Sequence, residues 1–140
     1  MLFAGSTRRW YPAAYKMKNK LHITLKTIDH KKQRVGEVGD YWEKKGKTTM
    51  VISKMKWEYQ ALVMIHELAE YFLCKKRGIT MKSIDNFDRR FYELGGRGEA
   101  GNAYTAPYKK EHKFASKVER MLAKELGVDF KKYEDAVDKL

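Results

Sequence analysis

The chain is poor in cysteine, has no long apolar run, and carries too few acidic residues to balance its basic ones. Its single cysteine, Cys74, excludes a disulfide framework and a cysteine-based metal cluster, and we expect a buried structural thiol there. No stretch reaches the roughly 20 apolar residues that a membrane-spanning helix needs, so no membrane partner is expected. The opening residues MLFAGSTRRW hold too short an apolar run before Arg8 for a secretory signal. These absences predict a soluble protein of a reducing compartment such as the cytoplasm.

The positive charge is large but scattered. Thirty Lys and Arg against eighteen Asp and Glu give a formal charge of +12, which favours anionic partners such as nucleic acid and also promotes solubility. The basic residues lie in many short groups, none long enough to form a binding arm. A solvated surface and an anion-binding face therefore both remain open. Apolar and aromatic contents of 43% and 13% exclude a disordered polyelectrolyte.

The patterning predicts one α+β domain over residues 1–140, mainly strand in 1–55 and mainly helix in 56–140. In the first part, Leu21, Ile23 and Leu25 alternate with polar residues, and Thr48 to Ser53 is rich in β-branched side chains. We expect these segments to belong to a small antiparallel sheet of two or three strands.

About four helices are predicted after the sheet. The first covers Trp57 to Arg77 and ends at Gly78, a residue suited to a left-handed C-cap. The others are a shorter amphipathic helix around Ile84 to Leu94, a third from Pro107 to Leu126 after a glycine-rich loop, and a last one capped by Asp129.

The most apolar stretch of the chain, ALVMIHELAEYFLC, has only three polar side chains: His66, Glu67 and Glu70. An ionised carboxylate in apolar surroundings is costly unless it pairs, takes up a proton or binds a cation. His66 and Glu70 are four residues apart and share a helix face, while Glu67 projects about 100° away.

This spacing matches H-E-x-x-H, in which the outer side chains hold a metal and the glutamate activates its water. Glu70 stands where the second histidine would be. A carboxylate can ligate zinc, the metal we expect, and also admits manganese, iron or magnesium. The pentad also occurs by chance, and His66 could instead be a core histidine bonded to a carbonyl.

A third ligand is expected from the third predicted helix. Glu111 lies within the predicted apolar stripe of that helix, and His112 lies on its flank; the stripe is Phe114, Ala115, Val118, Met121 and Leu122. Its position on the helix face makes Glu111 the better candidate for the third ligand, whereas His112 is better by its ligand chemistry, so both stay candidates.

Weaker candidates surround this set. Asp85 and Asp88 are interpreted as a capping residue and a solvated or ion-paired one, with the alternative that one of them holds a ligand histidine through its other ring nitrogen. Glu99 and Asn102 in the glycine-rich loop are weaker still. Tyr104 and Tyr108 could donate to an oxyanion but are more typical of packing residues.

From about Met50 to Val137 the chain resembles short uncharacterised proteins of tailed phages and prophages that look like minimal zincin-type metallopeptidases. The likeness is most specific at His66-Glu67 with Glu70, at Asp85 with Asp88, and at Glu111-His112-Lys113-Phe114-Ala115. The resemblance implies a zincin-like core in which the strand Thr48 to Ser53 positions an extended substrate. It also implies ligands at His66 and Glu70, a base at Glu67, and Glu111 or His112 as completing ligand. Glu70 departs from the peptidase pattern, in which histidine is usual.

Three functions follow as hypotheses. The first is a metal-dependent hydrolase, a zincin-like peptidase acting on a peptide or protein, in the host cytoplasm if the chain is phage-encoded. The second is a magnesium- or manganese-dependent nucleotide or phosphodiester hydrolase. The third is a non-catalytic phage-type protein that binds nucleic acid or a host factor through its basic surface.

Overall fold

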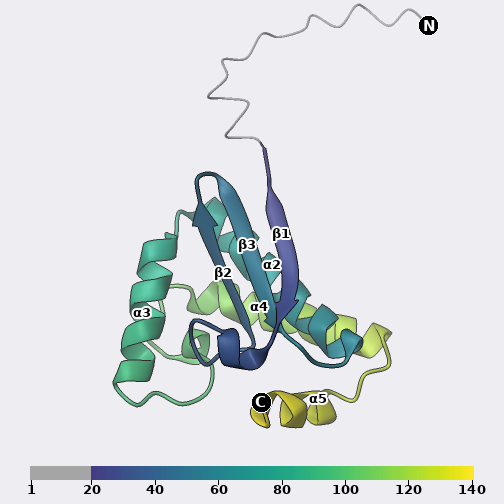
Figure 1. Ribbon diagram of the computed structural model, residues 1–140. Helices are drawn as coiled ribbons and strands as arrows, with labels where there is room; N and C mark the ends of the chain where they lie inside the picture. Colours follow the sequence, from purple (N-terminus) through teal and green to yellow (C-terminus); the bar gives the residue numbers. More distant parts are fainter. Residues whose placement is uncertain (1–19) are drawn as a thin grey trace, which may run out of the picture.

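The chain builds a three-stranded sheet first and four α-helices after it, which confirms the α+β class (Figure 1). The computed structural model describes residues 20–140, and the opening segment, in which the sequence predicts no secretory signal, lies outside this part. The elements in chain order are β1 (Ile23–Ile28), the 3-10 helix η1 (His30–Lys32), β2 (Gly39–Lys44), β3 (Lys47–Ser53), α2 (Trp57–Arg77), α3 (Met81–Glu93), the 3-10 helix η2 (Ala100–Asn102), α4 (Lys109–Glu125) and α5 (Phe130–Asp138).

The sheet is mixed, whereas the sequence predicted antiparallel pairing throughout. β3 lies in the centre, with β1 on one side and β2 on the other. β2 and β3 form an antiparallel hairpin whose turn residues, Lys45 and Gly46, have φ values of 51° and 72°, as a tight two-residue hairpin turn requires. β1 runs parallel to β3. The reason is that the connection 29–38 carries the chain past the end of β3, so β3 later inserts between the two earlier strands.

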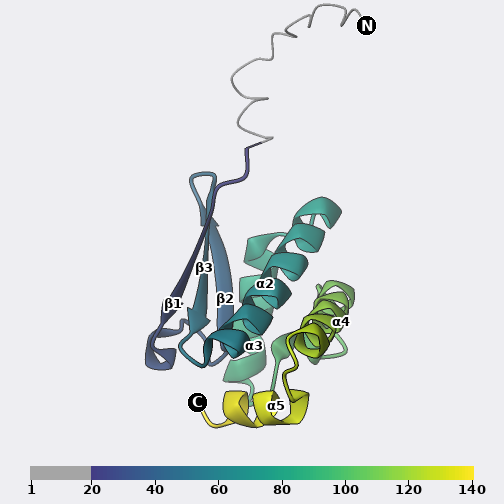
Figure 2. The same cartoon turned by 90° about the vertical axis from the view of Figure 1, so that its right-hand side faces the viewer.

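The helices pack in layers on one face of the sheet. Figure 2 shows α2 against the sheet and α4 on the far side of α2. Met50 of β3 is fully buried in a cluster that includes Tyr71 and Cys74 of α2. The thiol of Cys74 is therefore buried, as predicted, and burial raises its pKa to about 12. The helix α2 is thus covered on both sides, which explains its apolar sequence.

Helix ends follow the local signals. α2 ends where Gly78 takes the left-handed conformation, with φ of 71°, and donates its N–H to the Cys74 carbonyl. At the start of α5, the Asp129 side chain accepts the Lys132 N–H at 3.1 Å. Both predicted caps are confirmed. Every helix within residues 20–140 is too short or too polar to span a lipid bilayer.

The buried face of α4 differs from the predicted stripe. Of the predicted stripe, Ala115 is fully buried and Leu122 packs against a buried cluster, but Phe114 and Met121 are 50% and 69% exposed. The buried residues of this helix are Glu111, His112, Ala115, Glu119 and Ala123. The helix is therefore rotated so that its polar groups face α2, because these groups find partners there.

Candidate metal centre

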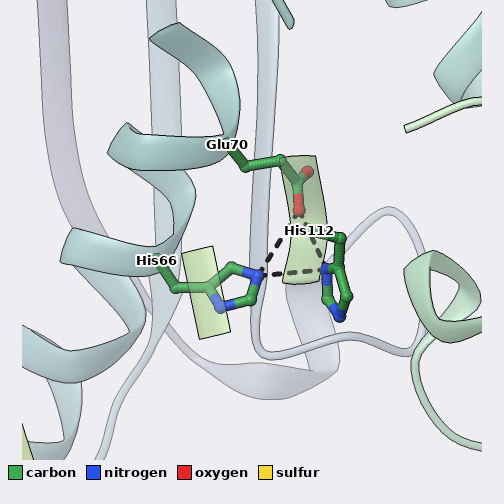
Figure 3. Close-up of side chains that lie close together, drawn as sticks. All are labelled: His66, Glu70 and His112. Carbon is green, nitrogen blue, oxygen red and sulfur yellow. Dashed lines mark hydrogen bonds and ion pairs between the residues drawn. The ribbon is translucent and has the colours of Figure 1, made fainter. Parts of the chain in front are cut away.

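Two helices bring His66, Glu70 and His112 to one point between them (Figure 3). His66 and Glu70 lie one turn apart on α2, and His112 lies on α4. All three are buried, with 5–6% of each residue exposed. One ligand atom from each lies within 4.8 Å of the other two. The three residues therefore form a group that could hold a metal ion.

The distances within this group suit a small divalent cation. His66 Nε2 and His112 Nδ1 are 3.1 Å apart. Glu70 Oε2 lies 3.4 Å from the first nitrogen and 2.9 Å from the second. In a tetrahedral zinc site with bonds of about 2.0–2.1 Å, neighbouring ligand atoms are about 3.3 Å apart. The triangle of donor atoms has nearly this size.

A carboxylate holds the outer nitrogen of each imidazole. Glu119 Oε2 lies 2.8 Å from His66 Nδ1, and Glu99 Oε2 lies 2.9 Å from His112 Nε2. An ionised carboxylate only accepts hydrogen bonds, so each ring donates its outer N–H and can turn a lone pair inward. Together with Glu70, three electron-rich atoms then face one another. Such an arrangement needs protons or a cation between its members.

The same carboxylates raise the proton affinity of both imidazoles. Burial alone lowers the pKa of His66, but hydrogen bonds to Glu119 and Glu70 outweigh it and raise this pKa to about 11. Burial likewise lowers the pKa of His112, and its bonds to Glu70 and Glu99 raise it to about 9. Burial raises the pKa of Glu70, but the two histidines hold it at about 2. A metal ion that binds here must compete with these protons.

Glu67 lies beside the group without belonging to it. Its carboxylate faces β2, where a Cβ built on Gly39 would fall 2.5 Å from Glu67 Oε1. Only a glycine therefore lets the strand approach so closely. Burial raises the pKa of Glu67 well above its ordinary value, and the charge of Glu70 raises it further. A carboxyl group with increased basicity thus borders the same cavity as the three candidate ligands.

Glu111, the other candidate for third ligand, lies elsewhere. Its carboxylate is buried and accepts a hydrogen bond from Arg77 Nη1 at 2.9 Å. It lies one residue before His112, so it projects about 100° away round the helix. Arg77, in the last turn of α2, compensates its charge. The structure brings His112, and not Glu111, into the group of three.

The two aspartates of α3 bond to other partners than the histidines. The capping interpretation is wrong, because Thr80 caps the start of α3, and Asp85 instead lies 3.4 Å from Arg34 in an exposed ion pair. Asp88 is buried and accepts the Tyr108 hydroxyl at 2.6 Å. The Tyr108 ring meets the His112 ring edge-on, so this tyrosine packs against the centre. Of the remaining weak candidates, Tyr104 is 90% exposed.

Two groups that hold the centre were not identified from the sequence. Glu119 lies seven residues after His112, two helical turns along the same face of α4, and this spacing is the signal that could have identified it. The Tyr41 hydroxyl donates to Glu70 Oε1 at 2.9 Å, which leaves Glu70 Oε2 directed at the histidines. No sequence pattern indicated Tyr41, because the contact joins a strand to a helix 29 residues away.

The strand expected to position a substrate has both of its edges occupied. β3, which contains Thr48 to Ser53, pairs with β1 and with β2. Its backbone groups are therefore not available to another chain. In the described part of the chain β2 is an edge strand instead, and Gly39, Asp40 and Tyr41 of this strand line the cavity of the centre.

The cavity at the centre has a volume of about 780 Å³ and is acidic. Among residues 20–140, two Lys or Arg side chains line it, namely Arg120 and Lys131. Ten of the eighteen acidic residues of the chain line it: Glu37, Asp40, Glu67, Glu70, Asp85, Asp88, Glu99, Glu119, Glu134 and Asp138. The local charge is thus opposite to the net charge of the protein.

Comparison with protein-family models, with curated proteins and with solved structures finds no match to this chain.

Proposed function

We propose that the protein is a metal-dependent hydrolase, a minimal zincin-like metallopeptidase in which His66, Glu70 and His112 hold the metal and Glu67 is the base. The observation that carries this proposal is the convergence of three ligand atoms next to a carboxyl group of raised pKa. The proposal carries forward the function that the sequence resemblance to zincin-type phage proteins implies.

The ligand set favours zinc. Two imidazoles and one carboxylate are a donor set of catalytic zinc sites, which keep a further position for water or substrate. A bound zinc ion would polarise a carbonyl group and lower the pKa of water towards ~7. The carboxylates at the outer nitrogens, Glu119 and Glu99, would fix the orientation of both rings.

Glu67 carries the proton transfers. It takes a proton from the attacking water and returns it to the leaving amine. Its raised pKa suits this role, because a carboxylate of ordinary pKa is a weak base near neutral pH. Its side chain lies against Gly39 of β2 and lines the same cavity as the candidate ligands.

An extended peptide is the substrate that the surroundings favour. Within residues 20–140, β2 has a partner strand on one side only, and its outer edge can pair with an added strand through main-chain hydrogen bonds if Arg34 leaves the Tyr41 carbonyl. The acidic lining of the cavity repels phosphate groups, which disfavours a nucleotide or phosphodiester substrate at this centre. The excess positive charge lies outside the cavity, so nucleic-acid binding would use another surface.

The test is the substitution Glu67→Gln, followed by zinc content and hydrolysis of an unfolded protein such as casein. We expect zinc to be retained and hydrolysis to fall by roughly 10²- to 10⁴-fold, the usual contribution of a general base. Glu125→Gln, an exposed position near the end of α4, is the matched control and should change neither quantity. Unchanged hydrolysis in Glu67→Gln, or no zinc in the parent protein, refutes the proposal.

A further inference from the structure

A hydrogen-bonded chain joins the C-terminal helix to the candidate metal centre. The Tyr133 hydroxyl of α5 donates to Glu119 Oε1 at 2.5 Å. The other oxygen of Glu119 lies 2.8 Å from His66 Nδ1. The opposite nitrogen of His66 is the one directed at His112 and Glu70. One hydroxyl on α5 is thus two hydrogen bonds away from a ligand ring.

Packing fixes this hydroxyl in place. Tyr133 is 4% exposed, and its ring centroid lies 5.3 Å from that of Tyr59 and 5.3 Å from that of Phe130. The ring shares a buried cluster with Leu62 of α2 and Ala123 of α4. The phenol therefore cannot turn away without breaking this cluster, and its hydroxyl orients one oxygen of Glu119.

The consequence for His66 is a fixed tautomer. With Oε1 of Glu119 held by Tyr133, Oε2 remains to accept a proton from His66 Nδ1. A histidine that donates from Nδ1 presents the lone pair of Nε2, the nitrogen that a metal needs. The support of His112 is weaker, because the side chain of Glu99 is 51% exposed and lies in the glycine-rich loop.

We propose that α5 is part of the metal centre and that Tyr133 is a positioning residue, which acts through Glu119 to orient His66 towards the ion. This inference rests on the proposed function, since it requires that the three ligands bind a metal. It assigns a role to a residue that neither touches the ion nor lies on a ligand-bearing helix.

The test compares Tyr133→Phe with Tyr71→Phe in the full chain. Both changes remove one buried hydroxyl; that of Tyr71 is 2.8 Å from Thr48 Oγ1 on β3, and Tyr71 does not line the cavity of the centre. The protein is loaded with Co²⁺, whose visible absorption reports ligand geometry, and zinc affinity is measured by competition with a chelator. Thermal unfolding of each variant without added metal reports the purely structural cost.

We expect Tyr133→Phe to shift the Co²⁺ bands and to weaken zinc binding by about tenfold, the lower end for groups that orient a ligand. Tyr71→Phe should leave the Co²⁺ bands and the zinc affinity unchanged, while it lowers the melting temperature by about as much as Tyr133→Phe does. Co²⁺ bands of Tyr133→Phe that coincide with those of the parent protein overturn the inference. If Tyr133→Phe does not fold, Glu119→Gln replaces it and must shift the bands in the same way. A parent protein that binds neither Co²⁺ nor zinc refutes the proposed function itself, which separates the two failures.

Discussion

The contact between η2 and His112 yields the most direct test of the geometry. A Cβ added at Gly101 would fall 2.5 Å from His112 Cγ and 2.6 Å from Nδ1, the candidate ligand atom. Ordinary contact begins at 3.4 Å, so in Gly101→Ala the ring must retreat by about 0.9 Å. Tyr108 Cε2, at 2.9 Å from the same Cβ, blocks an easy shift of the loop. Metal–ligand distances tolerate only about 0.2 Å of deviation, so this displacement removes one ligand.

We expect Gly101→Ala to lower zinc affinity by at least about 100-fold, the upper end for changes that only misorient a ligand. The assay is a competition titration with a chromophoric zinc chelator at fixed pH, with circular dichroism to verify the fold. Gly36→Ala is the matched control, because Gly36 lines the same cavity and a Cβ there meets nothing within 4 Å. Parent-like zinc affinity in a folded Gly101→Ala protein would show that His112 is not a ligand.

Two further changes test the electrostatics around the centre. Burial raises the pKa of Glu37 from 4.5 to about 7. Between these two pH values the folded protein holds a proton that the unfolded chain releases, so the stability of the protein falls as pH rises through this range. The glutamine of Glu37→Gln can still accept hydrogen bonds from the Tyr92 hydroxyl and from the Ala100 N–H. We expect this variant to be more stable than the parent protein by at most about 3 kcal/mol near pH 8, and to differ little from it near pH 4. Urea unfolding at both pH values measures the difference. Arg77→Met leaves the buried Glu111 without its cation, and it should lower the free energy of unfolding by about 1–2 kcal/mol, since the arginine is half-exposed. Zinc affinity should not change. A large loss of zinc affinity would return Glu111 to the ligand set.

The sequence predicted well whatever depends on local spacing. The bounds of α2 followed from its apolar run and from Gly78, and the pairing of His66 with Glu70 followed from the helical period. The cap of α5 at Asp129 is equally local. These features depend on interactions between residues close in sequence, so an isolated segment already contains the information.

Features that depend on the packing of distant segments were not predicted. The parallel pairing of β1 with β3 is decided by the path of residues 29–38, which has no periodic pattern. The choice of His112 over Glu111 depends on how α4 is rotated against α2, and the presence of Arg77 opposite Glu111 could not be foreseen from spacing. Hydropathy assigned the inner face of α4 to its largest apolar residues, which is the wrong criterion for a helix whose inner face is polar.

The rotation of α4 is itself an argument about function. Full burial of a side chain such as Phe114 or Met121 would gain about 1.5–3 kcal/mol, yet both remain largely exposed while Glu111, His112 and Glu119 are buried. The observed rotation is stable because each buried polar group has a partner, as Glu111 has in Arg77 and as His112 and Glu119 have in the centre. Hydrophobic burial alone would turn this helix so that Phe114 and Met121 also face the interior. A helix that leaves Phe114 and Met121 exposed while it buries His112 and Glu119 is expected where a functional site, and not hydrophobic burial, decides the arrangement.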